Sequence, residues 1–169
     1  MSGKQTLREW VPVIVVAVIL GLFLRTFVVE RFVVDGPSME PTLRNREEVL
    51  VNKFVYRFTA PKRNDVVVFR YPLNPNLDYI KRVVAVGGQT VEVRNGKLFV
   101  DGVAVEEPMV RPWTGNLNKV IVPQGYVFVM GDNRPVSEDS RVFGPIPESS
   151  IRGKAFLVWW PLSRMRLIK

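Results

Sequence analysis

Beyond position 30, the apolar residues fall in short runs between turn-forming residues, and this spacing limits the fold more than any other feature of the sequence. No segment there keeps the 3.6-residue apolar period of a helix. Prolines and glycines, 13 and 12 in number, are spread along the chain and favour frequent turns. Short strands at regular spacing are typical of antiparallel sheets in barrel-like or sandwich folds. We therefore expect a mainly β protein with antiparallel sheets.

One hairpin can be located from the sequence. Asn95-Gly96 lies between two short segments of alternating character, which is the strongest short-range hairpin signal. This hairpin and the polar loop that follows it fall in the region from about 92 to 122, which we expect to be a small lobe inserted into the main sheet. The expected strands are residues 48–54, 65–71, 79–86, 90–94, 97–100, 120–122, 126–130 and 151–159.

The N-terminal part of the chain has a different pattern. Residues 10–24 carry no charge, and the longer segment 10–29 contains one charged residue, Arg25. A helix needs about 20 mostly apolar residues to cross a bilayer. The segment is apolar on every face, and no small-residue cleavage site follows it. We therefore expect residues 10–29 to form an uncleaved transmembrane anchor, with residues 1–9 as a short tail and 30–169 as the main domain.

Two absences restrict the chemistry of the chain. It contains no cysteine, which excludes disulfides, thiolate catalysis and cysteine-ligated metals. It also contains no histidine, which excludes Ser-His-Asp triads and histidine-ligated zinc. Hydrolytic chemistry would have to use Lys, Asp, Glu, Tyr or a hydroxyl group. The net charge of +8 fits either nucleic acid or an anionic membrane and does not choose between them.

A serine with unusual neighbours follows the N-terminal segment. Ser38 comes directly after Gly36 and Pro37, and Pro41 follows shortly afterwards. This composition predicts a rigid, exposed turn whose backbone N–H groups would be free to face an oxyanion. The sequence Gly36-Pro37-Ser38 is also typical of an ordinary turn, so this segment by itself does not establish an active site.

A lysine is placed in an apolar strand. On a strand, Lys81 shares one face with Tyr79 and Val83, while Ile80 and Arg82 share the other. One of the two basic residues should therefore point inward. Desolvation would lower the pKa of a buried lysine, and its neutral amine could then take a proton from a serine hydroxyl. The alternative is a lysine that extends to solvent from a strand edge.

A third segment, residues 131–144, is a polar loop after an apolar strand. An ion pair between Asp139 and Arg141, together with the hydroxyl of Ser137, would orient a nearby amine. A solvated loop of the same composition is the alternative.

Together and in this order, the three segments resemble type I signal peptidases, the Ser/Lys peptidases that remove leader sequences on the outer side of membranes. The resemblance covers nearly the whole chain and rests on GPSMEPTL at 36–43, YIKRV at 79–83 and GDNRPVSEDSR at 131–141. It implies that Ser38 is the nucleophile and Lys81 the general base, with Ser137 orienting the lysine. The residues that it implies as braces of the site are Asp132, Asp139 and Arg141.

The same resemblance implies a substrate and a location. It implies cleavage after Ala-x-Ala-type sites in signal peptides, with shallow pockets for the small side chains at −1 and −3. It also implies a single-pass protein of the cell membrane whose catalytic domain is extracytoplasmic. The lipid bilayer and the export translocon are expected partners, whereas nucleic acid, cofactors and metals are not. The residues implied to contact the substrate are Val34, Gly36, Met39, Leu43, Tyr79 and Ile80.

Two positions depart from the family pattern. Some members carry a serine two residues before the nucleophile, whose hydroxyl helps to hold the oxyanion, and this chain has Gly36 there. The oxyanion would then depend on backbone N–H groups, above all that of Ser38. Pro135-Val136 replaces the commoner Asp-Asn, at positions that are not catalytic in the family.

Two other functions remain open at this level. One is a self-cleaving Ser/Lys protease related to the SOS repressors, although those carry a DNA-binding domain where this chain has a long apolar segment. The other is a non-catalytic, basic module tethered to a membrane. Cleavage of a peptide with Ala at −3 and −1 by the detergent-solubilised protein would separate the peptidase from this module.

Overall fold

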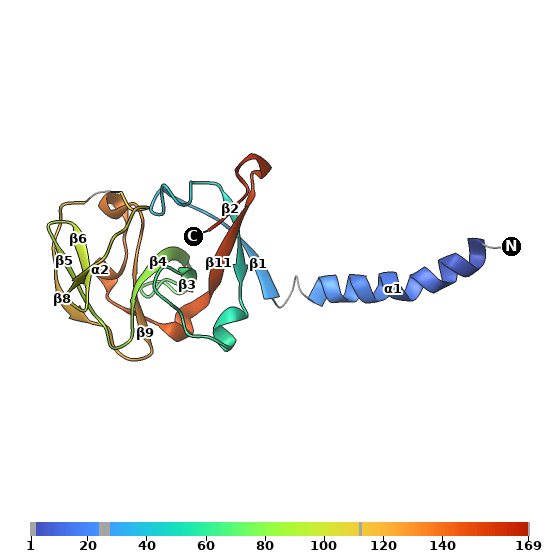
Figure 1. Ribbon diagram of the computed structural model, residues 1–169, viewed down its shortest axis with the longest axis horizontal. Coiled ribbons are helices and arrows are strands. Elements are labelled where there is room, and N and C mark those ends of the chain that lie inside the picture. Colours follow the sequence, from blue (N-terminus) through green and yellow to red (C-terminus); the bar gives the residue numbers. More distant parts are fainter. Residues whose placement is uncertain (1–2, 24–27, 112, 169) are drawn as a thin grey trace.

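The computed structural model describes residues 3–23, 28–111 and 113–168, apart from the side chains of residues 3–9, 20 and 22–23. A single long helix, α1 (Gly3–Phe23), projects away from a domain made mainly of antiparallel strands (Figure 1). The expectation of a mainly β, antiparallel protein is therefore confirmed.

The N-terminal segment differs from the expected anchor at 10–29. Helix α1 begins inside the expected tail, residues 24–27 lie outside the described residues, and Val29 is the first residue of strand β1 (Val29–Val33). Val29 is opposite Asn52 in an antiparallel ladder, so its backbone hydrogen bonds belong to a sheet and not to a helix. In the part of the chain that the structure describes, no helix is both long enough and apolar enough to span a membrane.

The larger sheet has the strand order β1-β2-β11-β3-β4-β9-β10, and β12 pairs with β11. All of its pairings are antiparallel. The central strand β3 is buried at four successive positions, which explains its continuous run of valines. Besides β1, the strands of this sheet are β2 (Glu48–Asn52), β3 (Val66–Arg70), β4 (Asp78–Val86), β9 (Tyr126–Met130), β10 (Ile146–Pro147), β11 (Ile151–Trp160) and β12 (Arg166–Leu167).

A smaller sheet lies between β4 and β9 in the chain. Its order is β7-β6-β5-β8, formed by β5 (Thr90–Arg94), β6 (Lys97–Val100), β7 (Val103–Ala104) and β8 (Leu117–Ile121). Arg94 pairs with Lys97 around the predicted Asn95-Gly96 turn, where both residues have positive φ, so the hairpin prediction is confirmed. The valines of this smaller sheet pack with Phe128 and Met130 of β9, and this packing joins the lobe to the main sheet (Figure 1).

Several elements were not expected from the sequence. They are too short for any periodic pattern to reveal them, since most contain one helical turn or two strand residues. Beyond β1, β7, β10 and β12, they are α2 (Ser140–Phe143) and the 3-10 turns η2 (Val55–Arg57), η3 (Arg134–Val136), η4 (Glu148–Ser150) and η5 (Leu162–Arg164).

Candidate active site

The segment around Ser38 is a loop held by neighbouring backbone. Asn133 donates its backbone N–H to the Ser38 carbonyl (3.0 Å) and its side-chain amide to the Pro37 carbonyl (3.1 Å). Gly36 turns the chain with φ +86°, and its N–H is bonded to the side chain of Asn45 (3.0 Å). The loop is therefore fixed on both sides of the serine.

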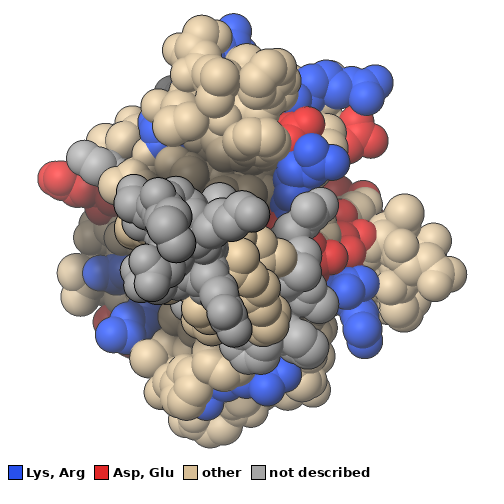
Figure 2. Space-filling view, turned by 90° about the vertical axis from the view of Figure 1, so that its right-hand side faces the viewer, with Lys and Arg blue, Asp and Glu red and all other residues tan. Residues whose placement is uncertain are grey.

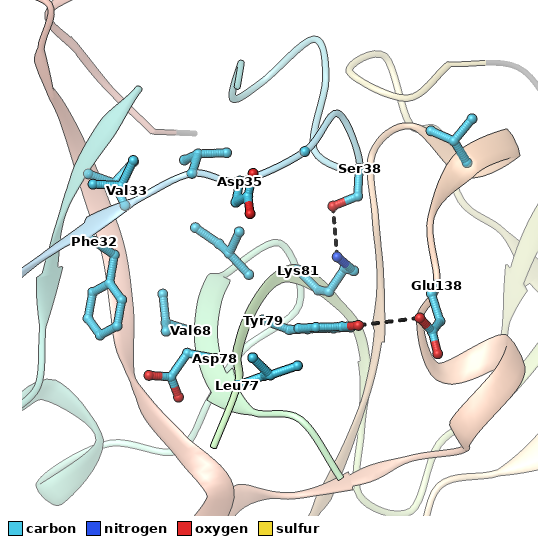
Figure 3. Close-up of a pocket in the computed structure, with 15 residues that line it drawn as sticks. Phe32, Val33, Asp35, Ser38, Val68, Leu77, Asp78, Tyr79, Lys81 and Glu138 are labelled. Carbon is cyan, nitrogen blue, oxygen red and sulfur yellow. Dashed lines mark hydrogen bonds between the residues drawn. The ribbon is translucent and has the colours of Figure 1, made fainter. Parts of the chain in front are cut away.

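Lys81 points from β4 directly at this serine. Its Nζ forms a hydrogen bond of 2.8 Å with Ser38 Oγ (Figure 3). The lysine is only 4% exposed, and its Nζ lies 5.1 Å from the centre of the Tyr79 ring, on the strand face that the sequence predicted. Burial lowers the pKa of the ammonium to about 8, which makes a neutral amine accessible near neutral pH.

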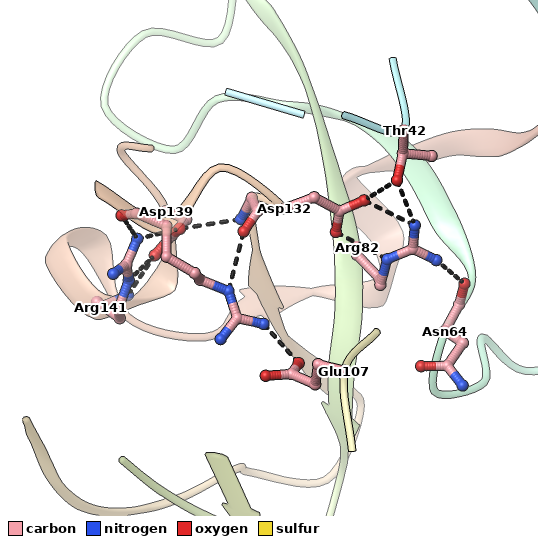
Figure 4. Close-up of polar contacts among 9 residues, drawn as sticks. Thr42, Asn64, Arg82, Glu107, Asp132, Asp139 and Arg141 are labelled. Carbon is pink, nitrogen blue, oxygen red and sulfur yellow. Dashed lines mark hydrogen bonds and ion pairs between the residues drawn. The ribbon is translucent and has the colours of Figure 1, made fainter. Parts of the chain in front are cut away.

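Arg82, the other basic residue of the pair, is buried as well. The expectation that only one of the two would point inward was wrong, because β4 is covered on both faces. Arg82 makes two hydrogen bonds to the Asp132 carboxylate, at 2.8 and 2.7 Å, and Thr42 donates its hydroxyl to the same carboxylate at 2.5 Å (Figure 4). A buried, bidentate ion pair thus joins β4 to the loop 131–141, and Thr42 connects the loop that carries Ser38 to the same carboxylate.

The expected ion pair between Asp139 and Arg141 is present. The Asp139 carboxylate accepts hydrogen bonds from Nε and Nη2 of Arg141, both at 2.8 Å, and from the backbone N–H of Gly131 at 2.9 Å. Arg141 also donates to the carbonyls of Arg134 and Ser137, at 2.8 and 3.2 Å. These bonds close the loop 131–141 on itself (Figure 4).

Ser137 lies close to the backbone of Ser38. Its Oγ is buried and has no hydrogen-bond partner among the described residues. A Cβ at position 131 would lie 2.2 Å from this Oγ and 2.5 Å from the Ser38 carbonyl oxygen. Only glycine fits at that point, so the approach of Ser137 to Ser38 depends on Gly131. The role of Ser137 in orienting the lysine stays a prediction.

A cleft of about 440 Å³ extends from Ser38 and Lys81 (Figure 3). Four of the six residues implied as substrate contacts line it, namely Val34, Gly36, Tyr79 and Ile80. Met39 and Leu43 do not line it. Both are fully buried in the core, where they support the loop from beneath. Apolar side chains that follow a turn are drawn into the nearest core, and the sequence pattern does not reveal on which side of the loop this core lies.

The cleft also contains residues that sequence reasoning missed. Its apolar wall includes Phe32 and Val68, which come from separate strands. Its polar lining includes Glu138, whose carboxylate accepts hydrogen bonds from Tyr71 (2.5 Å) and Tyr79 (3.3 Å). The two tyrosine rings are stacked at 4.2 Å. In the sequence, the signal that could have pointed to Glu138 as a site residue is its position next to Ser137. Within the described ranges, no group of three or more acidic side chains is arranged to hold a metal ion.

Comparison with known proteins agrees with this geometry. Residues 7–160 match the family model described as signal peptidase, peptidase S26. The chain is 42% identical to the probable signal peptidase I-1 of Synechocystis, over 96% of this chain and 87% of the relative. It is 37% identical to signal peptidase I S of Bacillus subtilis, over 98% and 96% of the two chains.

A solved structure is also similar. The crystal structure of a signal peptidase I from Enterococcus faecalis matches with a TM-score of 0.51 at 32% identity, covering 57% of this chain and 97% of the other. The family model covers most of the chain, and the relatives match over nearly its whole length. The chain therefore belongs to the signal peptidase family, peptidase S26, a family of serine endopeptidases that cleave signal peptides from preproteins.

Proposed function

We propose that this protein cleaves signal peptides from exported preproteins with Ser38 as nucleophile and Lys81 as general base. The observation that carries the proposal is the 2.8 Å hydrogen bond between Lys81 Nζ and Ser38 Oγ, made by a lysine whose pKa burial lowers to about 8. The absence of histidine adds support, because a serine nucleophile in this chain needs another base.

The reaction is an acyl transfer in two stages. Neutral Lys81 takes the hydroxyl proton of Ser38, and Oγ bonds to the scissile carbonyl carbon. The oxyanion that forms is held by backbone N–H groups, chiefly that of Ser38. The Lys81 ammonium then gives its proton to the leaving amine as the C–N bond breaks. In the second stage neutral Lys81 deprotonates a water molecule, which attacks the acyl-enzyme. The bond from the carbonyl carbon to Ser38 Oγ then breaks, and the Lys81 ammonium returns its proton to Oγ as the product carboxyl group is released.

Supporting residues and specificity complete the proposal. The buried Ser137 hydroxyl, which makes no hydrogen bond among the described residues, turns toward the Lys81 amine and orients it during the reaction, while Asp132, Asp139 and Arg141 keep the surrounding loops in place. An extended substrate places its −1 and −3 side chains on one side, because successive side chains alternate. The cleft wall formed by Val34 and Ile80 is apolar and accepts small side chains there, in agreement with an Ala-x-Ala preference.

The proposal includes attachment to the cell membrane, with residues 30–169 as an extracytoplasmic catalytic domain and the export translocon as a partner. Its support is the uncharged run at 10–24, of which residues 10–23 make up most of α1. Large apolar side chains of α1, including Trp10, Val16 and Ile19, are more than half exposed in the isolated chain. A continuous exposed apolar surface of this kind requires a covering partner, and a lipid bilayer provides one.

The decisive experiment uses the full-length protein in detergent and a preprotein with Ala at −3 and −1. Ser38→Ala and Lys81→Met are each expected to reduce cleavage by at least about a thousandfold, because each removes a group that acts in the bond-breaking steps. Mass spectrometry of the products locates the cleavage site, and circular dichroism checks that the variants are folded.

Ser149→Ala and Lys97→Met are matched controls, since both residues are exposed. They should cleave at the wild-type rate. Near wild-type turnover in Ser38→Ala or in Lys81→Met would refute the assignment of the catalytic pair.

A further inference from the structure

The chain between β7 and β8 of the small lobe contacts both loops of the candidate active site, the loop that carries Ser38 and the loop 131–141. We call residues 107–111 together with Trp113 the return segment. It follows β7 and precedes β8, so it belongs to the lobe in sequence, although its side chains reach the catalytic loops. None of its residues stood out in the sequence patterns.

The first contact is with the loop that carries Ser38. Arg111 Nη2 lies 2.9 Å from a carboxylate oxygen of Glu40, two residues after the serine. The Arg111 backbone N–H donates to the Asp132 carbonyl at 2.9 Å, and Arg111 and Asn133 form a parallel bridge. Asn133 in turn donates hydrogen bonds to the carbonyls of Pro37 and Ser38. Arg111 therefore links the serine loop to the backbone that supports it.

The second and third contacts are with the loop 131–141. Glu107 pairs at 2.5 Å with Arg134, whose side chain is 2% exposed (Figure 4). Arg134 Nε donates to the Gly131 carbonyl at 3.0 Å, next to the point where Ser137 and Ser38 approach each other. Trp113 presents its ring to the Arg141 guanidinium, with 4.4 Å between the ring centre and Cζ.

We propose that the return segment is a positioning brace for the Ser38/Lys81 pair, and that the ion pair of Glu40 with Arg111 sets the position of Ser38 for attack. This inference rests on the proposed catalytic pair. Lys81 is fixed by β4, whereas Ser38 lies on a loop, so the distance between the reacting groups depends on what holds that loop. A small displacement of a nucleophile lowers the rate of the chemical step far more than it lowers substrate binding.

The competing explanation is an ordinary surface ion pair without consequence for catalysis. The chain offers a closely matched control in the pair Glu92–Arg94, which lies on β5 within the same lobe. Its side chains are 26% and 55% exposed, against 27% for Glu40 and 51% for Arg111. Exposed pairs of this kind contribute little to stability, so a difference between the two pairs would report on catalysis.

The experiment measures kcat and KM of the full-length protein in detergent on a peptide with Ala at −3 and −1. Arg111→Met is expected to lower kcat about tenfold while KM changes less than about twofold, because the loop that holds Ser38 loses a tether and the cleft wall is unchanged. Arg94→Met should keep the wild-type kcat and KM. Arg111→Lys, which keeps a charge for the single contact with Glu40, should recover most of the loss.

A charge exchange tests the pair itself. The double variant Glu40→Arg/Arg111→Glu should have a higher kcat than either single variant, since it restores the attraction in reverse. Unchanged kcat in Arg111→Met, an equal loss in Arg94→Met, or an effect on KM alone would overturn the proposal. Ser38→Ala is measured in parallel. If that variant stays active, the catalytic assignment fails, whereas an inactive Ser38→Ala with a fully active Arg111→Met rejects the brace alone.

Discussion

At the scale of single residues, the decisive feature is a lysine whose surroundings act on its charge in opposite directions. Burial disfavours the Lys81 ammonium and is the larger effect, so the pKa falls to about 8. The carboxylates of Asp139, Glu138 and Asp132 favour the ammonium and keep the pKa from falling further. The amine is thus neutral in a useful fraction of molecules near neutral pH, as the proposed role of Lys81 as general base requires.

This balance predicts the pH dependence of the enzyme. Activity should rise with pH through about 8, because the base must be neutral. In Glu138→Gln one favourable negative charge is lost, the pKa of Lys81 falls, and the rise should move to lower pH. The measurement is kcat/KM against pH for the wild type, Glu138→Gln and the exposed control Glu106→Gln. A flat wild-type profile, or a shift of the Glu138→Gln profile to higher pH, would contradict this reasoning.

At the scale of elements, β4 determines the site because both of its faces are used. One face presents Lys81 to Ser38, and the other presents Arg82 to Asp132. The hydroxyl of Thr42 completes this second contact, so β4, the serine loop and the loop 131–141 meet at one carboxylate. The short elements around them, β1 and α2 among others, could not be predicted, since their hydrogen bonds depend on distant partners.

The buried pair makes a prediction about stability. Asp132→Asn should lower the free energy of unfolding by about 3 to 5 kcal/mol, because the Arg82 guanidinium is left buried without its counter-charge. The double variant Arg82→Met/Asp132→Leu should recover much of this loss, since neither position then carries a buried charge. Urea unfolding followed by circular dichroism measures both. An unchanged unfolding midpoint in Asp132→Asn would mean that the pair does not support the fold.

At the scale of the whole molecule, α1 and the small lobe lie at opposite ends of the domain (Figure 1). Viewed from the end where α1 emerges, Lys and Arg side chains appear on several sides of the surface, with acidic ones between them (Figure 2). The net charge of +8 is therefore not concentrated in one stripe on this face. The lobe contacts the loops of the candidate active site through its return segment.

Membrane attachment by α1 can be tested at this scale. The full-length protein should float with phosphatidylcholine vesicles in a density gradient, whereas Val15→Asp/Ile19→Asp should remain at the bottom. Each aspartate within an inserted apolar helix costs about 3 kcal/mol, which is enough to oppose insertion. Val103→Asp, an exposed apolar position in the lobe, is the matched control and should float. A wild-type protein that fails to float would refute the proposed attachment.

Features that depend on neighbouring residues or on side-chain chemistry could be predicted without the structure. The Asn95-Gly96 hairpin follows from local backbone preference, and the absence of histidine directs serine chemistry toward a lysine. Three motifs in a fixed order then identified Ser38 and Lys81 as the residues to examine. The Asp139–Arg141 pair could be expected because its members are two residues apart.

Which side chains are buried, and which residues they contact, could be learned only from the three-dimensional fold. Met39 and Leu43 were implied as cleft residues but are buried in the core, and Arg82 is buried beside Asp132. The pair of Glu40 with Arg111 joins residues 71 positions apart. Burial and long-range pairing are set by how the sheets pack on one another, and a local pattern contains no information about a partner that far along the chain.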